Sequence, residues 1–228
     1  MATDYEFFSL ESAGSTQIEA RERWSEHPVA VYAEGQTQGK GRGGDSWFSA
    51  DRSLAVSVTF RTELPTSERS VLALVAGLCA HETLTKAGCD GLGIKWPNDI
   101  LNARGAKVAG TLVESTDWAV TVGLGVNLWH RGDLVDNAGW LYASDPGASI
   151  GPRLSRAFTE RLLRAAEISF DRRAFVERCV TIGTAVTWDR EASGMATDVT
   201  LDGRLVVETA TGIELLSSGA VRHIRPLS

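Results

Sequence analysis

A glycine-rich loop between two predicted strands does most to limit the folds open to this chain. Residues Gly35–Gly44 contain five glycines; they follow an apolar run at Val29–Ala33 and precede an alternating run at Leu54–Phe60. Three of the glycines have GxGxxG spacing, but the residues after them lead into a strand and open no helix, so a dinucleotide-binding fold lacks its context. A P-loop also fits poorly, because the spacing to Lys40 is one residue short and Gly41 replaces the Ser or Thr that would bind magnesium. The loop therefore connects strand to strand.

The same loop has the composition of an anion-binding segment. Glycines let backbone N–H groups approach phosphate or carboxylate oxygens, and Lys40 and Arg42 add positive charge. The alternative is a flexible surface loop that binds nothing.

Hydrophobic periodicity and the positions of Gly and Pro divide the rest of the chain into a mixed α and β part and a β-rich tail. Helices are predicted at residues 15–24, 65–88 and 153 to about 170, and strands at 29–33, 54–60, 94–96, 107–114 and 119–124, with a turn at 102–105. After Cys179, β-like runs at 185–188, 199–201, 205–208, 213–216 and 220–224 alternate with turn residues at Gly194, Asp202-Gly203, Thr211-Gly212 and Ser218-Gly219. That pattern is typical of a small antiparallel barrel. We predict an α+β fold with one domain at residues 1–180 and a second at 181–228.

Composition limits the partners and the compartment. The 228 residues carry a formal charge of −6, which argues against broad nucleic-acid binding, because neutralising phosphates requires an excess of Lys and Arg. No apolar run approaches the roughly 20 residues of a membrane helix, and Asp4 and Glu6 stand where a signal peptide would be basic. The three cysteines have no metal-ligand spacing and are expected to be reduced structural thiols. We expect a cytoplasmic protein with no membrane segment.

The segment Lys95–Asp99 joins a strand end to two polar side chains. Pro97 directly after Trp96 ends the strand and fixes the direction of the Asn98-Asp99 pair. Such a pair can orient a magnesium-bound phosphate. The alternative is an Asx turn, in which both side chains bond their own backbone, and turns explain such pairs more often than catalysis does.

Two later strands contain glycines in their middle. The strand Lys107–Glu114 begins with a lysine that is either solvated or directed into a site, and Gly110 is the kind of mid-strand glycine that often marks close approach by a ligand or another backbone. On the next strand, Gly123 and Gly125 precede Asn127, whose amide can pair with an adenine edge. The alternative at these glycines is a β-bulge.

Taken together and in this order, five segments resemble the biotin protein ligase family across nearly the whole chain. They are Ser15-Thr16-Gln17, Gln36–Phe48, Lys95–Asp99, Lys107–Glu114 and Gly123–Asn127, and the β-rich tail also fits. The resemblance implies a mixed β-sheet flanked by helices, similar to class II aminoacyl-tRNA synthetases and biotin synthetases, followed by a small SH3-like β-barrel. It also implies that biotin and ATP, accompanied by Mg²⁺, give biotinyl-5′-AMP and pyrophosphate. A lysine of a biotin carboxyl carrier protein domain then attacks the mixed anhydride.

The resemblance implies a role for each matching residue. Biotin contacts are implied for Ser15, Thr16, Gln17, Gln36, Lys40, Gly41, Arg42, Lys107 and Gly110. Contacts to ATP or the adenylate are implied for Lys40, Arg42, Trp47, Asn98, Lys107, Gly123, Gly125 and Asn127. Lys107 and Arg42 are the catalytic candidates, and Asp99 is the candidate for magnesium.

Three positions depart from the family's pattern. Gln17 stands where the family often has Asn, Lys40 replaces the first Arg of an Arg-Gly-Arg loop, and Asp45 falls where a cation is common. Because Lys lacks the planar fork that binds a carboxylate bidentately, these changes leave open how tightly the adenylate is held.

Rival functions remain at this level. A lipoate ligase also adenylates a carboxylate, and a non-catalytic biotin sensor would share the pocket, although retention of Lys107 speaks against a sensor. An octanoyl transferase needs an activated cysteine, and no cysteine lies in an electropositive motif. Only Met1–Gly14 precede the first motif, so we expect no DNA-binding domain. A homodimer and the identity of the acceptor carboxylase stay open.

Overall fold

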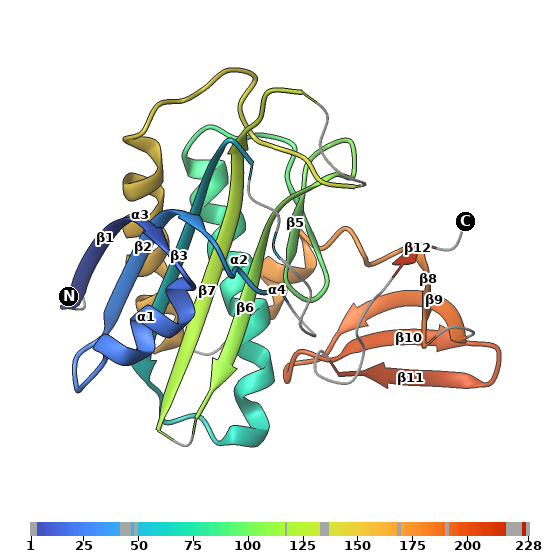
Figure 1. Ribbon diagram of the computed structural model, residues 1–228. Helices are drawn as coiled ribbons and strands as arrows, with labels where there is room; N and C mark the ends of the chain where they lie inside the picture. The colour runs from blue at the N-terminus through green and yellow to red at the C-terminus, as the bar shows by residue number, and fades with distance from the viewer. Residues whose placement is uncertain are drawn as a thin grey trace.

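The computed structural model describes residues 4–41, 47, 50–116, 118–132, 137–167, 170–189, 192–217 and 225–226. Its strands, α-helices and one 3₁₀-helix (η2) form a larger and a smaller sheet with covering helices (Figure 1). The elements of the larger part are β1 (Glu6–Ala13), α1 (Thr16–Arg23), β2 (Val29–Gln36), β3 (Arg52–Arg61), η2 (Thr66–Val71), α2 (Leu72–Lys86), β4 (Gly93–Lys95), β5 (Asp99–Leu101), β6 (Lys107–Ser115), β7 (Ala119–Trp129), α3 (Ile150–Ala166) and α4 (Arg172–Val176). Those of the smaller sheet are β8 (Ala185–Trp188), β9 (Ala192–Val199), β10 (Leu205–Thr209), β11 (Gly212–Leu216) and β12 (Arg225–Pro226).

The larger sheet has seven strands in the order β1-β2-β3-β7-β6-β5-β4. The β1–β2 pair is parallel and every other pair is antiparallel, so the sheet is mixed. Helix α1 lies on one face, and α2 and α3 lie on the opposite face (Figure 1). This arrangement confirms the predicted mixed sheet flanked by helices.

The interior strand β3 is buried along nearly its whole length, and its two faces carry side chains of different size. Leu54, Val56, Val58 and Phe60 belong to the main core that includes α2 and α3. The alternating positions are the smaller Ala55, Ser57 and Thr59, which therefore face α1. On α3, buried residues recur every four positions, at Ile150, Leu154, Phe158 and Leu162, which is the spacing of one helix face. The large side chains thus fill one side of the sheet and leave space on the other.

The smaller sheet is antiparallel, with the order β11-β10-β9-β8-β12, and lies to one side of the larger sheet (Figure 1). Its buried side chains, including Val186, Trp188 and Leu205, continue the same hydrophobic core as the larger part. The predicted fold class, a helix-flanked mixed sheet followed by a small SH3-like part, is confirmed. The boundary at residue 180 stays a prediction.

Several elements differ from the sequence-based expectation. The sequence pattern does not predict β1, because the exposed Glu6 and Glu11 weaken its strand signal. It does not predict β5 either, which begins just after Pro97 and pairs antiparallel with β4. The predicted strand at 199–201 is wrong, because β9 ends at Val199 and residues 200–203 form a turn. The predicted reversal at Gly194 is also wrong.

Gly194 lies inside β9 for a reason of packing. A Cβ there would lie 2.5 Å from the carbonyl oxygen of Glu208 on β10, so the glycine permits close approach of two strands. The turns at Asp202-Gly203 and Thr211-Gly212 do occur, with Gly203 at φ +85°. The predicted turn at Ser218-Gly219 and strand at 220–224 lie outside the described residues.

Helix α3 begins earlier and ends earlier than predicted. It starts at Ile150 because Pro152 falls in the first turn, where a helix needs no N–H donor. It ends at Ala166, and Phe170 lies beyond it. Across the part of the chain that the structure describes, no helix combines the length and apolar character needed to cross a membrane.

Candidate active site

A cavity of about 160 Å³ lies between the N-terminus of α1 and the middle strands of the larger sheet. The predicted site residues that line it are Ser15, Thr16, Gln17, Gln36, Lys40, Gly41, Trp47, Asn98, Asp99, Lys107, Gly110, Gly123 and Gly125. These residues come from five segments that are separate in the sequence. The fold therefore brings nearly the whole predicted set to one place.

The floor of the cavity is formed by small residues on three adjacent strands. Ala55 of β3 pairs with Gly125 of β7, and Ser57 pairs with Gly123. Gly110 of β6 pairs with the other side of Gly125. Because these positions lack large side chains, a ligand can lie directly against the sheet backbone.

The wall beside α1 is polar and nearly buried. The side-chain oxygen of Gln36 accepts hydrogen bonds from the Thr16 backbone N–H at 2.8 Å and from the Thr16 hydroxyl at 3.0 Å. The Thr16 hydroxyl also lies 2.8 Å from the Ser57 hydroxyl. Gln36 thus satisfies one of the free N–H groups of the first helical turn. Ser15, which precedes the helix, makes no side-chain capping bond, so its hydroxyl is available to the cavity.

Gln17 presents a buried acceptor to the same wall. Its Nε2 donates to the carbonyl oxygen of Leu112 at 3.4 Å, whereas its Oε1 has no hydrogen-bond partner among the described residues. A Cβ on Gly123 would lie 3.3 Å from the Gln17 amide carbon, so the glycine gives this side chain its room. A buried acceptor without a donor costs about 1–3 kcal/mol, which favours a ligand N–H at this position.

Lys107 enters the cavity and pairs with Asp99. Its Nζ lies 2.6 Å from Asp99 Oδ1 and 5.4 Å from the centroid of the Trp47 ring. The Lys107 side chain is 37% exposed, so it is partly withdrawn from water. The ion pair and the place of Lys107 in the cavity lining favour a site residue over a merely solvated lysine. Gly110 allows this position, because a Cβ there would lie 2.9 Å from Lys107 Cε.

Asn98 and Asp99 are held by cross-strand contacts. Thr111 N–H donates to the Asn98 carbonyl oxygen at 3.0 Å, and Asn98 Nδ2 donates to the Thr111 carbonyl oxygen. Asp99 opens β5, where it pairs with Gly110 of β6. These contacts favour a role at the cavity over a purely local Asx turn. Their side chains bond residues on β6 and line the cavity.

The glycine-rich loop contributes Lys40, Gly41 and Trp47 to the cavity. Trp47 N–H donates to the Gly39 carbonyl oxygen at 3.0 Å, which closes the loop on itself. The Trp47 ring lies over Gly125, where a Cβ would be 2.7 Å from the indole. The catalytic candidate Arg42 and the departure at Asp45 lie outside the described residues.

Asn127 is the described site candidate that does not line the cavity. Its Nδ2 donates to the carbonyl oxygen of Gly139 at 3.1 Å, and the residue is buried. The alternative of a β-bulge does not hold at Gly123 and Gly125, since the pairing of β7 with β3 is regular there. The register shifts farther along β7, between Asn127 and Trp129, opposite Ser53 and Arg52.

Five further residues line the cavity but were not predicted from the sequence. They are Ala55, Ser57, Thr111, Leu112 and Leu124. The sequence does contain a pattern that could have indicated Ser57, because small and polar residues alternate with large apolar ones along β3. Such alternation on a strand covered on both faces indicates a second face with polar contacts.

The three cysteines are buried free thiols, as predicted. Burial raises the pKa of Cys79 from 9.0 to about 12 and raises the pKa values of Cys89 and Cys179. None of the three lines the cavity. This environment disfavours the nucleophilic thiolate that an octanoyl transferase needs.

We expect all three thiols of the folded protein to resist alkylation at pH 8. The raised pKa lowers the thiolate fraction of Cys79 by about a thousandfold relative to an ordinary thiol, and burial blocks the reagent as well. Because the raised pKa keeps the Cys79 thiol neutral in the folded protein, its contribution to stability is present below pH 9 and falls as the pH rises toward 12. Iodoacetamide labelling followed by mass spectrometry measures the reaction, with urea-unfolded protein as the control. Rapid labelling of one cysteine in the folded state would contradict the prediction.

The described residues contain no cluster of three or more His, Cys, Asp or Glu side chains that could hold a metal ion. The charged groups that line the cavity among the described residues are Lys40, Asp99 and Lys107, and the last two are paired. The geometry suits an anionic ligand, with one cation at the loop and one on β6.

Comparisons with known proteins agree with this geometry. Residues 14–130 match the biotin/lipoate A/B protein ligase family, and residues 181–223 match the biotin protein ligase C terminal domain. The chain is 32% identical to the biotin--[acetyl-CoA-carboxylase] ligase of Mycobacterium tuberculosis over 86% of this chain and 79% of that protein. It is also 32% identical to the bifunctional ligase/repressor BirA of Escherichia coli, over 78% of this chain and 61% of that protein.

A solved structure extends the likeness to the whole fold. The biotin protein ligase from Aquifex aeolicus in complex with biotin and ATP is 26% identical, with a TM-score of 0.81 over 97% of this chain and 99% of that one. The fold, the cavity and both family matches agree. The chain therefore belongs to the biotin/lipoate A/B protein ligase family, and within it to the biotin protein ligases.

Proposed function

We propose that this protein activates biotin with ATP and transfers it to a lysine of an acceptor protein. In the first step the biotin carboxylate attacks the α-phosphorus of ATP, which forms biotinyl-5′-AMP and releases pyrophosphate. In the second step the acceptor amine attacks the carbonyl carbon of the mixed anhydride, and AMP leaves. The observation that carries this proposal is the convergence of Lys107, the glycine floor and the polar end of α1 in one cavity.

Lys107 is the main catalytic group in this proposal. Negative charge gathers on the α-phosphate oxygens and the attacking carboxylate in the transition state, and a fixed cation stabilises that charge. The 2.6 Å contact with Asp99 orients the ammonium before substrates arrive. The Lys107 ammonium then needs to move little as the transition state forms. Lys40 of the glycine-rich loop supplies a second cation. We propose that Arg42 of the same loop also stabilises the negative charge of the reacting carboxylate and phosphates.

The wall at α1 suits the ureido ring of biotin, which carries two N–H donors and one carbonyl acceptor. The unpartnered Oε1 of Gln17 accepts one N–H, and the Ser15 hydroxyl donates to the carbonyl. Thr16 and Gln36 hold this wall in shape through their mutual hydrogen bonds. Gly41 and Gly110 border the carboxylate end of the ligand.

The nucleotide lies over β7, which carries Gly123 and Gly125, beneath Trp47, with Asn98 beside the phosphates. Asn127 borders the adenine side from behind the cavity wall. Magnesium enters with ATP as part of the substrate, and Asp99 is the carboxylate that lines the cavity among the described residues. Its pairing with Lys107 fits a contact through the phosphate-bound ion better than a resident metal site.

The acceptor is a lysine on a biotin carboxyl carrier protein domain of a carboxylase. We propose residues 1–180 as the catalytic domain and 181–228 as the small SH3-like domain. A cytoplasmic location, the absence of a DNA partner and a homodimer remain predictions from the sequence.

An adenylation assay with two carboxylic acids tests the function. The protein is incubated with radiolabelled ATP and magnesium, together with either biotin or lipoate. Pyrophosphate and a labelled adenylate are expected with biotin alone. Product with lipoate alone would favour the lipoate ligase alternative, and product with neither acid despite biotin binding would favour a sensor.

A further inference from the structure

The smaller sheet is tied to the hairpin that carries Asn98 and Asp99. Trp96, which lies between β4 and β5, is 2% exposed. Its ring N–H donates to the carbonyl oxygen of Gly203 at 3.1 Å, and its backbone N–H donates to the Thr181 hydroxyl at 2.9 Å. The Trp96 side chain therefore connects the hairpin that carries Asn98 and Asp99 to the turn at Gly203, which lies 107 positions later in the chain.

The chain just before the smaller sheet holds the first strand of the same hairpin. Ile94 N–H donates to the Arg178 carbonyl oxygen at 2.8 Å, and Val180 N–H donates to the Ile94 carbonyl oxygen at 2.9 Å. With the two bonds of Trp96, the hairpin has four hydrogen bonds to residues from 178 onward. Among the described residues β4 is an edge strand of the larger sheet, and the segment around Cys179 pairs with its outer side.

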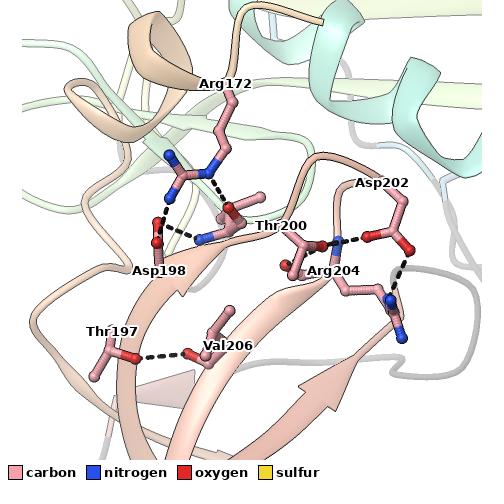
Figure 2. A network of polar contacts seen from close by, with 8 residues as sticks. Arg172, Thr197, Asp198, Thr200, Asp202, Arg204 and Val206 are labelled. Carbon is pink, nitrogen blue, oxygen red and sulfur yellow. Dashed lines mark hydrogen bonds and ion pairs between the residues drawn. The ribbon is translucent and has the colours of Figure 1, made fainter.

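The turn that meets Trp96 is held in a fixed shape by its own side chains (Figure 2). Thr200 and Arg204 exchange bonds across it: Arg204 N–H donates to the Thr200 hydroxyl at 3.0 Å, and Thr200 N–H donates to the Arg204 carbonyl oxygen at 2.8 Å. Asp202 accepts from the Thr200 hydroxyl and pairs with Arg204 Nε at 2.8 Å. These bonds fix the direction of the Gly203 carbonyl that receives the indole N–H.

The turn is also placed against the larger part. A Cβ on Gly203 would lie 3.2 Å from Leu74 of α2, so the turn fits closely on that helix. Arg172, at the start of α4, donates to the Val199 carbonyl oxygen and pairs with Asp198 just before the turn (Figure 2). The turn is thus a fixed support and not a free hairpin end.

We infer that the turn Thr200–Arg204 is a positioning element for adenylate formation: through Trp96 it holds the β4–β5 hairpin so that Asp99 meets Lys107. This inference rests on the proposed function. The hairpin is short, with three residues in each strand. A small rotation of it moves Asp99 relative to β6 and breaks the 2.6 Å contact with Lys107. The wall at α1 that would receive the ureido ring is built from Thr16, Gln36 and Ser57 and their mutual hydrogen bonds, none of which lies on the hairpin, so we expect biotin affinity to be retained.

Thr200→Val tests the inference, with Thr209→Val as the matched control. Both threonines use their hydroxyl to hold a hairpin turn of the smaller sheet, but the Thr209 turn is exposed and does not contact Trp96. Thr200→Val removes all the hydrogen bonds of the Thr200 hydroxyl within the turn. We expect it to lower the single-turnover rate of pyrophosphate release about three- to tenfold, a change equivalent to about one hydrogen bond at the site. The dissociation constant for biotin, measured by calorimetry, stays unchanged, and Thr200→Ser restores the rate. Thr209→Val leaves both quantities unchanged.

The route through the indole is tested in a Trp96→Phe background, which removes the ring N–H donor together with part of the buried indole volume, so rates are compared within that background. There Thr200→Val should cause no further loss of rate, because the bond that transmits its effect is already absent. A full additional loss in that background, or a normal rate in folded Thr200→Val protein, would overturn the inference.

Amide hydrogen exchange keeps this test independent of activity. Thr200→Val should speed exchange at residues 99–101, whereas Thr209→Val should not. If the wild-type protein releases no pyrophosphate with biotin, the proposed function fails, and the exchange result still decides whether the turn positions the hairpin. Equal protection of residues 99–101 in the two variants counts against the inference.

Discussion

Replacing Lys107 with alanine is expected to lower the rate of biotinyl-5′-AMP formation at least about a hundredfold. This is the effect of removing one well-placed donor that stabilises the transition state by about 3 kcal/mol. Two effects act together. The transition state loses a cation beside the α-phosphate, and Asp99 loses the ammonium 2.6 Å from its Oδ1. The uncompensated carboxylate then faces the incoming phosphates in a partly closed cavity, where repulsion between like charges is strong. Single-turnover release of pyrophosphate measures the rate.

Two companion variants separate charge from folding. Lys86→Ala removes an exposed lysine at the end of α2, away from the cavity, and should leave the rate unchanged. Lys107→Arg keeps the charge but alters its shape, so we expect an intermediate rate. Near wild-type turnover by folded Lys107→Ala protein would exclude the catalytic role.

Replacing Trp96 with alanine is expected to lower the free energy of unfolding by about 3–5 kcal/mol, the usual cost of truncating a large buried aromatic side chain. Trp96 is among the largest fully buried side chains and belongs to the core that the larger part shares with the smaller sheet. Its removal leaves a cavity at the junction and leaves the Gly203 carbonyl without the indole N–H. Urea unfolding monitored by circular dichroism gives the change.

Trp118→Ala is the matched control for this loss. Trp118 is 71% exposed, so the same substitution should change the free energy of unfolding by less than about 0.5 kcal/mol. If Trp96→Ala were as mild as Trp118→Ala, the junction would contribute little to the fold. In that case the two parts would be more autonomous than their shared core indicates.

The sequence by itself determined the chemistry of the site. Glycines at 110, 123 and 125 and the lysine at 107 are local signals, because a mid-strand glycine weakens a strand and needs a packing reason wherever it occurs. The helix at α1, the strand β3 and the change to short strands after Cys179 are likewise readable, since they follow from residue periodicity. The family resemblance joined these signals into one predicted site, and the described candidates other than Asn127 line one cavity.

Tertiary structure decided which residues meet. The partner of Lys107 depends on the register of β5 against β6, and β5 is a three-residue strand that no periodic pattern reveals. The capping of α1 by Gln36 joins residues 20 positions apart, and the bond from Trp96 to Gly203 joins residues 107 positions apart. Periodicity records how each residue relates to its neighbours along the chain. Contacts such as these are set instead by strand register and by the packing of distant segments, and only the folded chain fixes them.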